Sequence, residues 1–261
     1  MSVENDQAAP EPSAYSGSTA EFEELRALST PDNQFHLRIP RWGIADVAIA
    51  LGGAVFLSII LAIVSKIVDA DFTRGWLVLF AVAVPWVSLL GWPILVAKLK
   101  GNGARIDFGL SINLDVIRTG VVGGLCALAV GAIVARISIY FFGPLSSTAG
   151  DIGSSLHGPV RVIFALLALF AAPICEEIAF RGLVFGSFAR LLSSPRIANL
   201  IAAIAFSLFH FEPKRFFILL AIGFVLGEVR IRTQRTSASA IAHMVNNLPS
   251  AVMLLVGLPP R

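Results

Sequence analysis

Three ionisable side chains lie close together inside a strongly apolar stretch of the chain: Glu176, Glu177 and Arg181. Residues 162–174, just before this cluster, contain no ionisable side chain, and Arg181 is the only one in residues 178–189. A charge at the centre of a bilayer costs roughly 2.5–3.5 kcal/mol on insertion scales. Three charges in such a stretch therefore indicate a functional site.

The spacing within the cluster separates its two carboxylates. Glu177 and Arg181 are four residues apart, so on a helix they share a face and can form an ion pair. Glu176 is rotated by about 100° from Glu177 and can face a cavity while Glu177 is held by Arg181. The pattern predicts one supporting carboxylate and one that is available for chemistry.

Two later apolar segments carry polar side chains at a depth in the bilayer similar to that of Glu176. With about 1.5 Å of rise per residue, Glu176 and His210 each lie about 20 Å above the basic residues at the inner ends of their helices. The same count gives about 12 Å for His243 and about 18 Å for Asn247, which are four residues apart and share a face. These positions predict one polar cavity near the middle of the bilayer.

The residue types in this cavity point to hydrolysis. A glutamate and a histidine that face one water can activate it as general bases, and a histidine with an asparagine can stabilise a developing oxyanion. A zinc peptidase with Glu and His ligands is an alternative, although the chain has no His-Glu-x-x-His. A membrane scaffold, an immunity-type protein and a proton-coupled transporter are further alternatives, but a transporter usually carries such features in both halves.

The composition is that of a membrane protein. Hydrophobic residues make up 56% of the chain, charged residues 14%, and the mean hydropathy is +0.79, whereas a soluble domain carries about 25% charged residues. Both cysteines, Cys126 and Cys175, lie in apolar runs, which argues against a disulfide framework or a cysteine metal site. We expect no cofactor, no resident metal and no nucleic-acid partner.

The apolar runs define the expected fold. The first three and the last reach the roughly 20 residues that a spanning helix needs, and the fourth is longer still. The fifth and sixth are short and separated only by residues 212–215, which would allow a re-entrant hairpin. Residues 98–118 are predicted to form a surface linker. We predict an all-α, polytopic bundle of about seven helices, from the runs at residues 44–65, 75–97, 119–142, 160–189, 198–211, 216–227 and 238–258.

Two parts of the chain differ in composition. Residues 1–40 are rich in Glu, Asp, Ser, Ala and Pro, do not resemble a signal peptide, and are predicted to form a disordered acidic tail. Residues 41–261 are predicted to form the membrane domain, and residues 160–258 hold the candidate site.

The basic residues predict the orientation. Eleven Lys and Arg fall on one side of the predicted bundle and six on the other, so we expect a multi-pass protein of the cell membrane whose N-terminus is cytoplasmic. The larger set is Arg38, Arg41, Lys98, Lys100, Arg105, Arg118, Arg190, Arg196, Arg230, Arg232 and Arg235. The smaller set is Lys66, Arg74, Arg161, Lys214, Arg215 and Arg261.

Three motifs together resemble a known family. Glu176-Glu177-x-x-x-Arg181, Phe206-x-x-x-His210 and His243-x-x-x-Asn247 are similar, in order and separation, to the signatures of the CPBP membrane proteases, relatives of the type II CAAX prenyl endopeptidase. The resemblance covers roughly the last hundred residues.

The resemblance implies an intramembrane glutamic endopeptidase that acts without metal on a membrane-associated protein or peptide. It implies that Glu176 and His210 activate water, that His243 and Asn247 stabilise the oxyanion, and that Glu177 and Arg181 support them. Residues 232–237 depart from the Arg-Thr-Gly-Ser-Leu-Trp that family members often carry before the third motif, so neighbouring substrate contacts can differ.

Overall fold

The computed structural model describes residues 37–71 and 75–257, and within these ranges every regular element is a helix. The first half contains α2 (Ile44–Ile67), α3 (Leu77–Ala83), η2 (Val87–Gly91), α4 (Trp92–Lys100), α5 (Ala104–Asp107), α6 (Leu114–Phe142) and α7 (Thr148–Ser155). The second half contains α8 (Gly158–Leu166), η3 (Leu167–Ala171), α9 (Ala172–Glu177), η4 (Ile178–Val184), α10 (Phe185–Leu192), α11 (Pro195–Phe209), η5 (Pro213–Arg215), α12 (Phe216–Thr233) and α13 (Thr236–Leu255).

Five continuous helical stretches in the described ranges are long and apolar enough to cross a membrane: Ile44–Ile67, Leu77–Lys100, Leu114–Phe142, Gly158–Leu192 and Thr236–Leu255. The prediction of an all-α membrane bundle is therefore confirmed, but the count of about seven spans is not. The fifth and sixth apolar runs form α11, which has 15 residues, and α12, which carries Glu228, Arg230 and Arg232 near its end.

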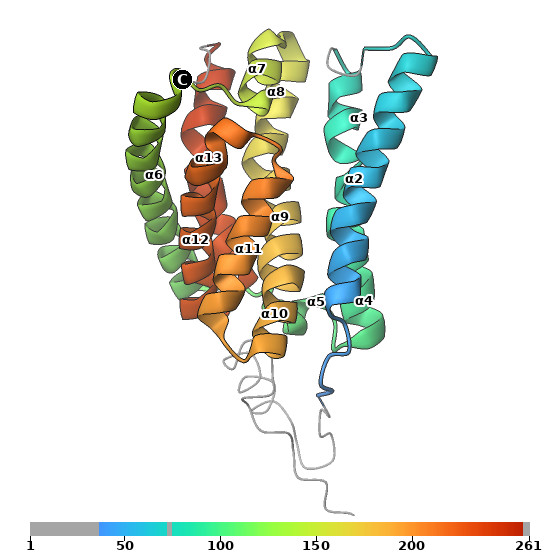
Figure 1. The fold of residues 1–261 in the computed structure, drawn as a ribbon, viewed down its shortest axis with the longest axis vertical. Coiled ribbons are helices and arrows are strands. Elements are labelled where there is room, and N and C mark those ends of the chain that lie inside the picture. The colour runs from blue at the N-terminus through green and yellow to red at the C-terminus, as the bar shows by residue number, and fades with distance from the viewer. Residues whose placement is uncertain (1–36, 72–74, 258–261) are drawn as a thin grey trace, which may run out of the picture.

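The helices form two parts, shown in Figure 1. Helices α2, α3 and α4 stand beside a larger bundle made of α6 and the helices from α8 to α13. Glycines let α6 approach α13 closely: a Cβ on Gly124 would lie 2.5 Å from Val245 Cβ, and one on Gly120 would lie 2.8 Å from Ile241 Cβ. Small residues at such crossings are typical of helix packing in membranes.

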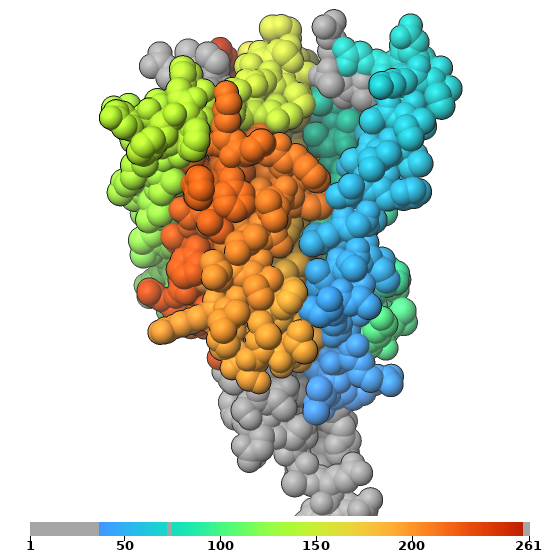
Figure 2. Space-filling model, viewed as in Figure 1, coloured from blue at the N-terminus to red at the C-terminus, as the bar shows by residue number. Residues whose placement is uncertain are grey.

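The two parts are joined at the end of the molecule where α2 begins. Arg190 of α10 donates a hydrogen bond to the carbonyl of Trp42 (2.5 Å), and the backbone N–H of Thr236 on α13 donates to the carbonyl of Phe108 (3.1 Å). Figure 2 shows α2 against α10 over this lower half of the molecule. Asp107 and Phe108 are buried, so the prediction of a surface linker over residues 98–118 is wrong at its centre, where the linker seals the junction.

The helix ends that carry most of the predicted cytoplasmic arginines and lysines gather at this same end, next to the start of α2 (Figure 1). The orientation of that end relative to the cytoplasm stays a prediction. So do the domain boundaries, since residues 1–36 of the predicted tail lie outside the described residues.

Candidate active site

The glutamate cluster lies on a long helix that is interrupted by two π-helical segments. Between Gly158 and Leu192 the backbone passes through two π-helical segments, η3 and η4, and the cluster occupies the end of α9 and the start of η4. Segments of this kind inside α-helices are frequent at functional sites, because they re-aim side chains without ending the helix.

Glu177 and Arg181 form the predicted ion pair. Arg181 Nη1 lies 2.7 Å from Glu177 Oε1, and both side chains are fully buried. The other terminal nitrogen of Arg181, Nη2, donates to the carbonyl of Gly223 on α12 (2.8 Å), and the guanidinium lies 4.7 Å from the ring centroid of Phe206 on α11. Arg181 therefore ties the helix of the cluster to both of the neighbouring shorter helices.

His243 lies between the two carboxylates. Its Nδ1 is 3.0 Å from Glu177 Oε1, and its Nε2 is 3.9 Å from Glu176 Oε2. A carboxylate only accepts hydrogen bonds, so Nδ1 carries the proton and donates it to Glu177. The contact fixes the ring and aims Nε2 toward Glu176, and the distance of 3.9 Å is beyond a direct hydrogen bond.

The carbonyl of Phe206 orients His210. His210 follows the last residue of α11, and its Nδ1 lies 2.8 Å from that carbonyl. Because a carbonyl cannot donate, Nδ1 is the protonated nitrogen, which leaves Nε2 of the neutral ring as an acceptor or base. The two rings also pack edge to face with centroids 4.6 Å apart.

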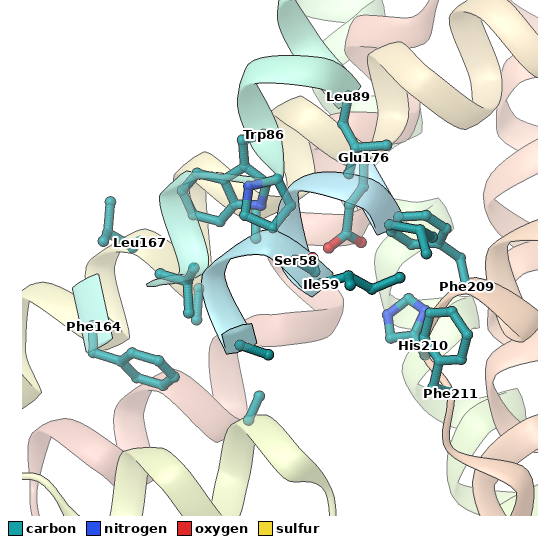
Figure 3. A pocket seen from close by; sticks show the side chains of 17 residues that line it. Ser58, Ile59, Trp86, Leu89, Phe164, Leu167, Glu176, Phe209, His210 and Phe211 are labelled. Atoms are coloured by element: carbon teal, nitrogen blue, oxygen red, sulfur yellow. The ribbon is translucent and has the colours of Figure 1, made fainter. Parts of the chain in front are cut away.

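Glu176 and His210 face one cavity of about 640 Å³, shown in Figure 3. Its wall is otherwise mainly apolar and includes Trp86, Leu167 and Phe209. The side chain of Glu176 is 18% exposed, whereas that of Glu177 is fully buried. Among the residues described, no hydrogen bond or ion pair joins Glu176 directly to His210, so the cavity leaves space between them for a small reactant.

Asn247 is held one helical turn beyond His243. Its amide nitrogen donates to the carbonyl of Ala168, at 3.1 Å. In a π turn that carbonyl would accept from residue 173, but Pro173 has no N–H, so Asn247 supplies the missing donor. The second N–H of the amide is not used by this contact.

The structure thus brings Glu176, Glu177, Arg181 and His243 into one contact network and places His210 across a shared cavity from Glu176. Asn247 joins this group through the backbone of η3 rather than through the cavity wall. Phe206 contacts both His210 and Arg181. The sequence marks this residue, because it is the first residue of the second motif.

The turn after α11 also helps to position His210, and no sequence motif indicates this role. Phe211 adopts a left-handed backbone conformation with φ 54°, which is uncommon for a residue with a bulky side chain. Next to it, Glu212 accepts from the backbone N–H of Thr148 at 2.6 Å and pairs with Arg215 at 2.6 Å. Glu212 therefore attaches the turn to the start of α7, and this turn holds His210 in place.

Replacing Glu212 should test this positioning. Glu212→Ala removes both contacts and is expected to lower any hydrolytic activity by about tenfold to a hundredfold, because small misplacements of a reacting group are costly. Glu212→Gln keeps an acceptor for Thr148 and should retain most of the activity. Asp115→Ala, which removes an exposed partner of Arg118, is the control. Equal activity in Glu212→Ala and wild type would show that the turn does not position His210.

Comparisons with known proteins match this same region. Residues 158–249 match the model of the family described as type II CAAX prenyl endopeptidase Rce1-like, and the match includes every residue of the candidate site. This segment is similar to that family. The resemblance read from the three motifs is thereby confirmed, and the chain is a multi-pass membrane protein of the CAAX protease-like type.

A curated relative extends the similarity beyond the motifs. The chain is 27% identical over 183 residues to the "Putative membrane peptidase YdiL" of Bacillus subtilis, a match that covers 69% of this chain and 71% of the relative. No solved structure matches the chain. The family match and this relative both support a membrane protease.

Proposed function

We propose that the chain is an intramembrane endopeptidase in which Glu176 and His210 activate a water that attacks a peptide bond. The observation that carries this proposal is the shared cavity: a carboxylate and an imidazole from two different helices face one largely apolar space. In such surroundings a polar pair has few competing partners, and its interactions with a reactant are strengthened.

The protonation pattern defines the step. With Nδ1–H of His210 donating to the carbonyl of Phe206, Nε2 accepts a hydrogen bond from the water, and the Glu176 carboxylate accepts a second one. A lone pair of the water oxygen then forms a bond to the carbonyl carbon. One proton of the water passes to the Glu176–His210 pair and from there to the departing amine, as the carbon–nitrogen bond breaks.

The oxyanion formed by this attack needs donors. Nε2 of His243 faces Glu176, and in a ring that carries both protons this nitrogen can donate a hydrogen bond to the oxyanion. Asn247 can offer its second amide N–H. Glu177 and Arg181 hold the ring of His243 and the helix in place.

The family points to the substrate class. Its model is named for a prenyl endopeptidase, so the substrate we propose is a membrane-associated protein or peptide, prenylated or otherwise hydrophobic. Purified protein in liposomes, mixed with a solubilised membrane-protein extract, should generate new N-termini detectable by mass spectrometry. Identical N-termini from empty liposomes would contradict the proposal.

Metal removal separates this mechanism from a zinc peptidase on the same residues. Among the described residues no group of three or more His, Cys, Asp or Glu side chains is arranged to hold a metal ion. We therefore expect cleavage to persist after treatment with a strong chelator. Activity that is lost on chelation and restored by zinc would favour the metallopeptidase.

A further inference from the structure

The cavity that holds Glu176 and His210 is one-sided. Its lining residues on α2 run from Val55 to Ala62, in the half of that helix farther from its start. Its lining on the long helix stops at Glu176 and extends from there toward Phe164, and Ala149 of α7 completes it. Every lining residue thus lies at the level of Glu176 or on the side of it where α7 is found.

The opposite side is closed by packed side chains. Directly below Glu176 on the same helix, Phe180 and Leu183 are fully buried, and Trp42 and Phe108 are buried at the base. Trp42 and Phe108 pack edge to face, and the guanidinium of Arg190 lies 3.6 Å from the ring centroid of Trp42. A reactant cannot reach Glu176 from the end where α2 begins without disrupting this core.

The opening is marked by exposed residues of the lining. Ile59 of α2 is 52% exposed and Phe211, in the turn after α11, is 72% exposed. On the other flank, α3 packs on α8 through Val78 and Phe164, which closes the cavity there. We infer that the space is entered between α2 and the turn that carries His210. Figure 3 shows Ile59 of α2 near His210 and Phe211 of this turn.

We propose that the substrate reaches Glu176 through this opening, from the side of the membrane where α7 lies, and that an apolar stretch of its polypeptide occupies the cavity. The inference rests on the proposed function for the nature of the reaction, but the side of access follows from the packing alone. A volume of about 640 Å³ lies within the roughly 300–1,000 Å³ of ligand pockets. By the distribution of basic residues, this side faces away from the cytoplasm.

The occupant is a polypeptide because the cavity ends at the pair that would cleave one. Its wall offers few other polar partners, and the hydroxyl of Ser58 already donates to the carbonyl of Ala54. Unpaired backbone groups are costly in such surroundings. The only good partners for the backbone of the substrate are therefore at Glu176 and His210, which places the reacting bond there and apolar side chains in the rest of the cavity.

Two-sided cysteine labelling tests the side of access without requiring proteolysis. Ser58→Cys, in a background where the exposed Cys126 is replaced by alanine, is treated in sealed vesicles of each orientation with a membrane-impermeant maleimide. Ser155→Cys, at the end of α7, and Ser193→Cys, between α10 and α11, mark the two sides. We expect Ser58→Cys to react from the Ser155 side only, since hydrolysis needs water in the cavity. Reaction from the Ser193 side, from both sides or from neither would overturn the proposal.

Filling the cavity tests the occupant. Ala62→Phe places a large side chain in the lining, whereas Ala48→Phe does so on an exposed part of α2 outside the cavity. Ala62→Phe is expected to lower cleavage at least tenfold and to slow labelling of Ser58→Cys, and Ala48→Phe should change neither by more than twofold. Unchanged cleavage in Ala62→Phe would show that the substrate does not use the cavity. If wild type cleaves nothing, the proposed function fails, while the labelling still reports the side of access.

Discussion

Glu176→Gln is expected to lower the rate of substrate cleavage by about 10²–10⁴-fold, the range that a general base contributes, without unfolding the protein. The amide keeps the size of the side chain but cannot take a proton from water. The charge of Glu176 is not needed for stability, because Arg181 is already paired with Glu177. The measurement is the rate at which new N-termini form in liposomes, together with the thermal unfolding midpoint.

His210→Ala should lower the cleavage rate by a similar factor, because it removes Nε2, the second acceptor for the water. The hydrogen bond from Nδ1 to the carbonyl of Phe206 leaves this nitrogen free to act as a base. Glu228→Gln on α12 and His157→Ala, an exposed histidine, are matched controls that should cleave at near wild-type rates. If Glu176→Gln or His210→Ala cleaves as fast as these controls, the assignment of roles is wrong.

Arg181→Met is expected to lower the free energy of unfolding by about 3–5 kcal/mol, because it leaves the carboxylate of Glu177 buried without its ionic partner. The change also removes the hydrogen bond to the carbonyl of Gly223 and the contact with Phe206. The measurement is equilibrium unfolding in detergent micelles with a denaturing detergent.

A double variant separates this cause from loss of packing. Glu177→Gln combined with Arg181→Met leaves no unpaired charge and should regain much of the stability, yet cleave poorly because His243 loses its carboxylate partner. Arg118→Met is the control, since its partner Asp115 is largely exposed and lies 3.9 Å away. An effect of Arg181→Met as small as that of Arg118→Met would mean that the buried pair is not a main support of the fold.

Helical spacing was sufficient to predict the centre of the site. Residues four apart on a helix must share a face, so the pairing of Glu177 with Arg181 and the separate direction of Glu176 follow from the sequence. The rise per residue placed Glu176 and His210 at one level, and both indeed line one cavity. Depth is readable in this way because a membrane helix is straight enough for its rise to be counted.

The rotation of each helix about its axis and the packing between helices could not be predicted from the sequence. The count of rise does not give the rotation of α13 about its axis, so the contact of His243 with Glu177 was not predicted. The contact of Asn247 with Ala168 depends on a π segment before Pro173, for which the sequence pattern gives no sign. One cavity was predicted for Glu176, His210, His243 and Asn247, but only Glu176 and His210 line it. Residues of α2 and of the second span form its other wall, because the approach of separate helices depends on side-chain packing.

The central claim is that Glu176 and His210 hold the attacking water between them, and an experimental structure in lipid at a resolution that shows water tests it most directly. We expect one ordered water within about 3.2 Å of both a carboxylate oxygen of Glu176 and Nε2 of His210, and we expect this water to be lost in His210→Ala. A wild-type structure in which His210 faces lipid, or in which no water reaches Glu176 through the cavity, would contradict it.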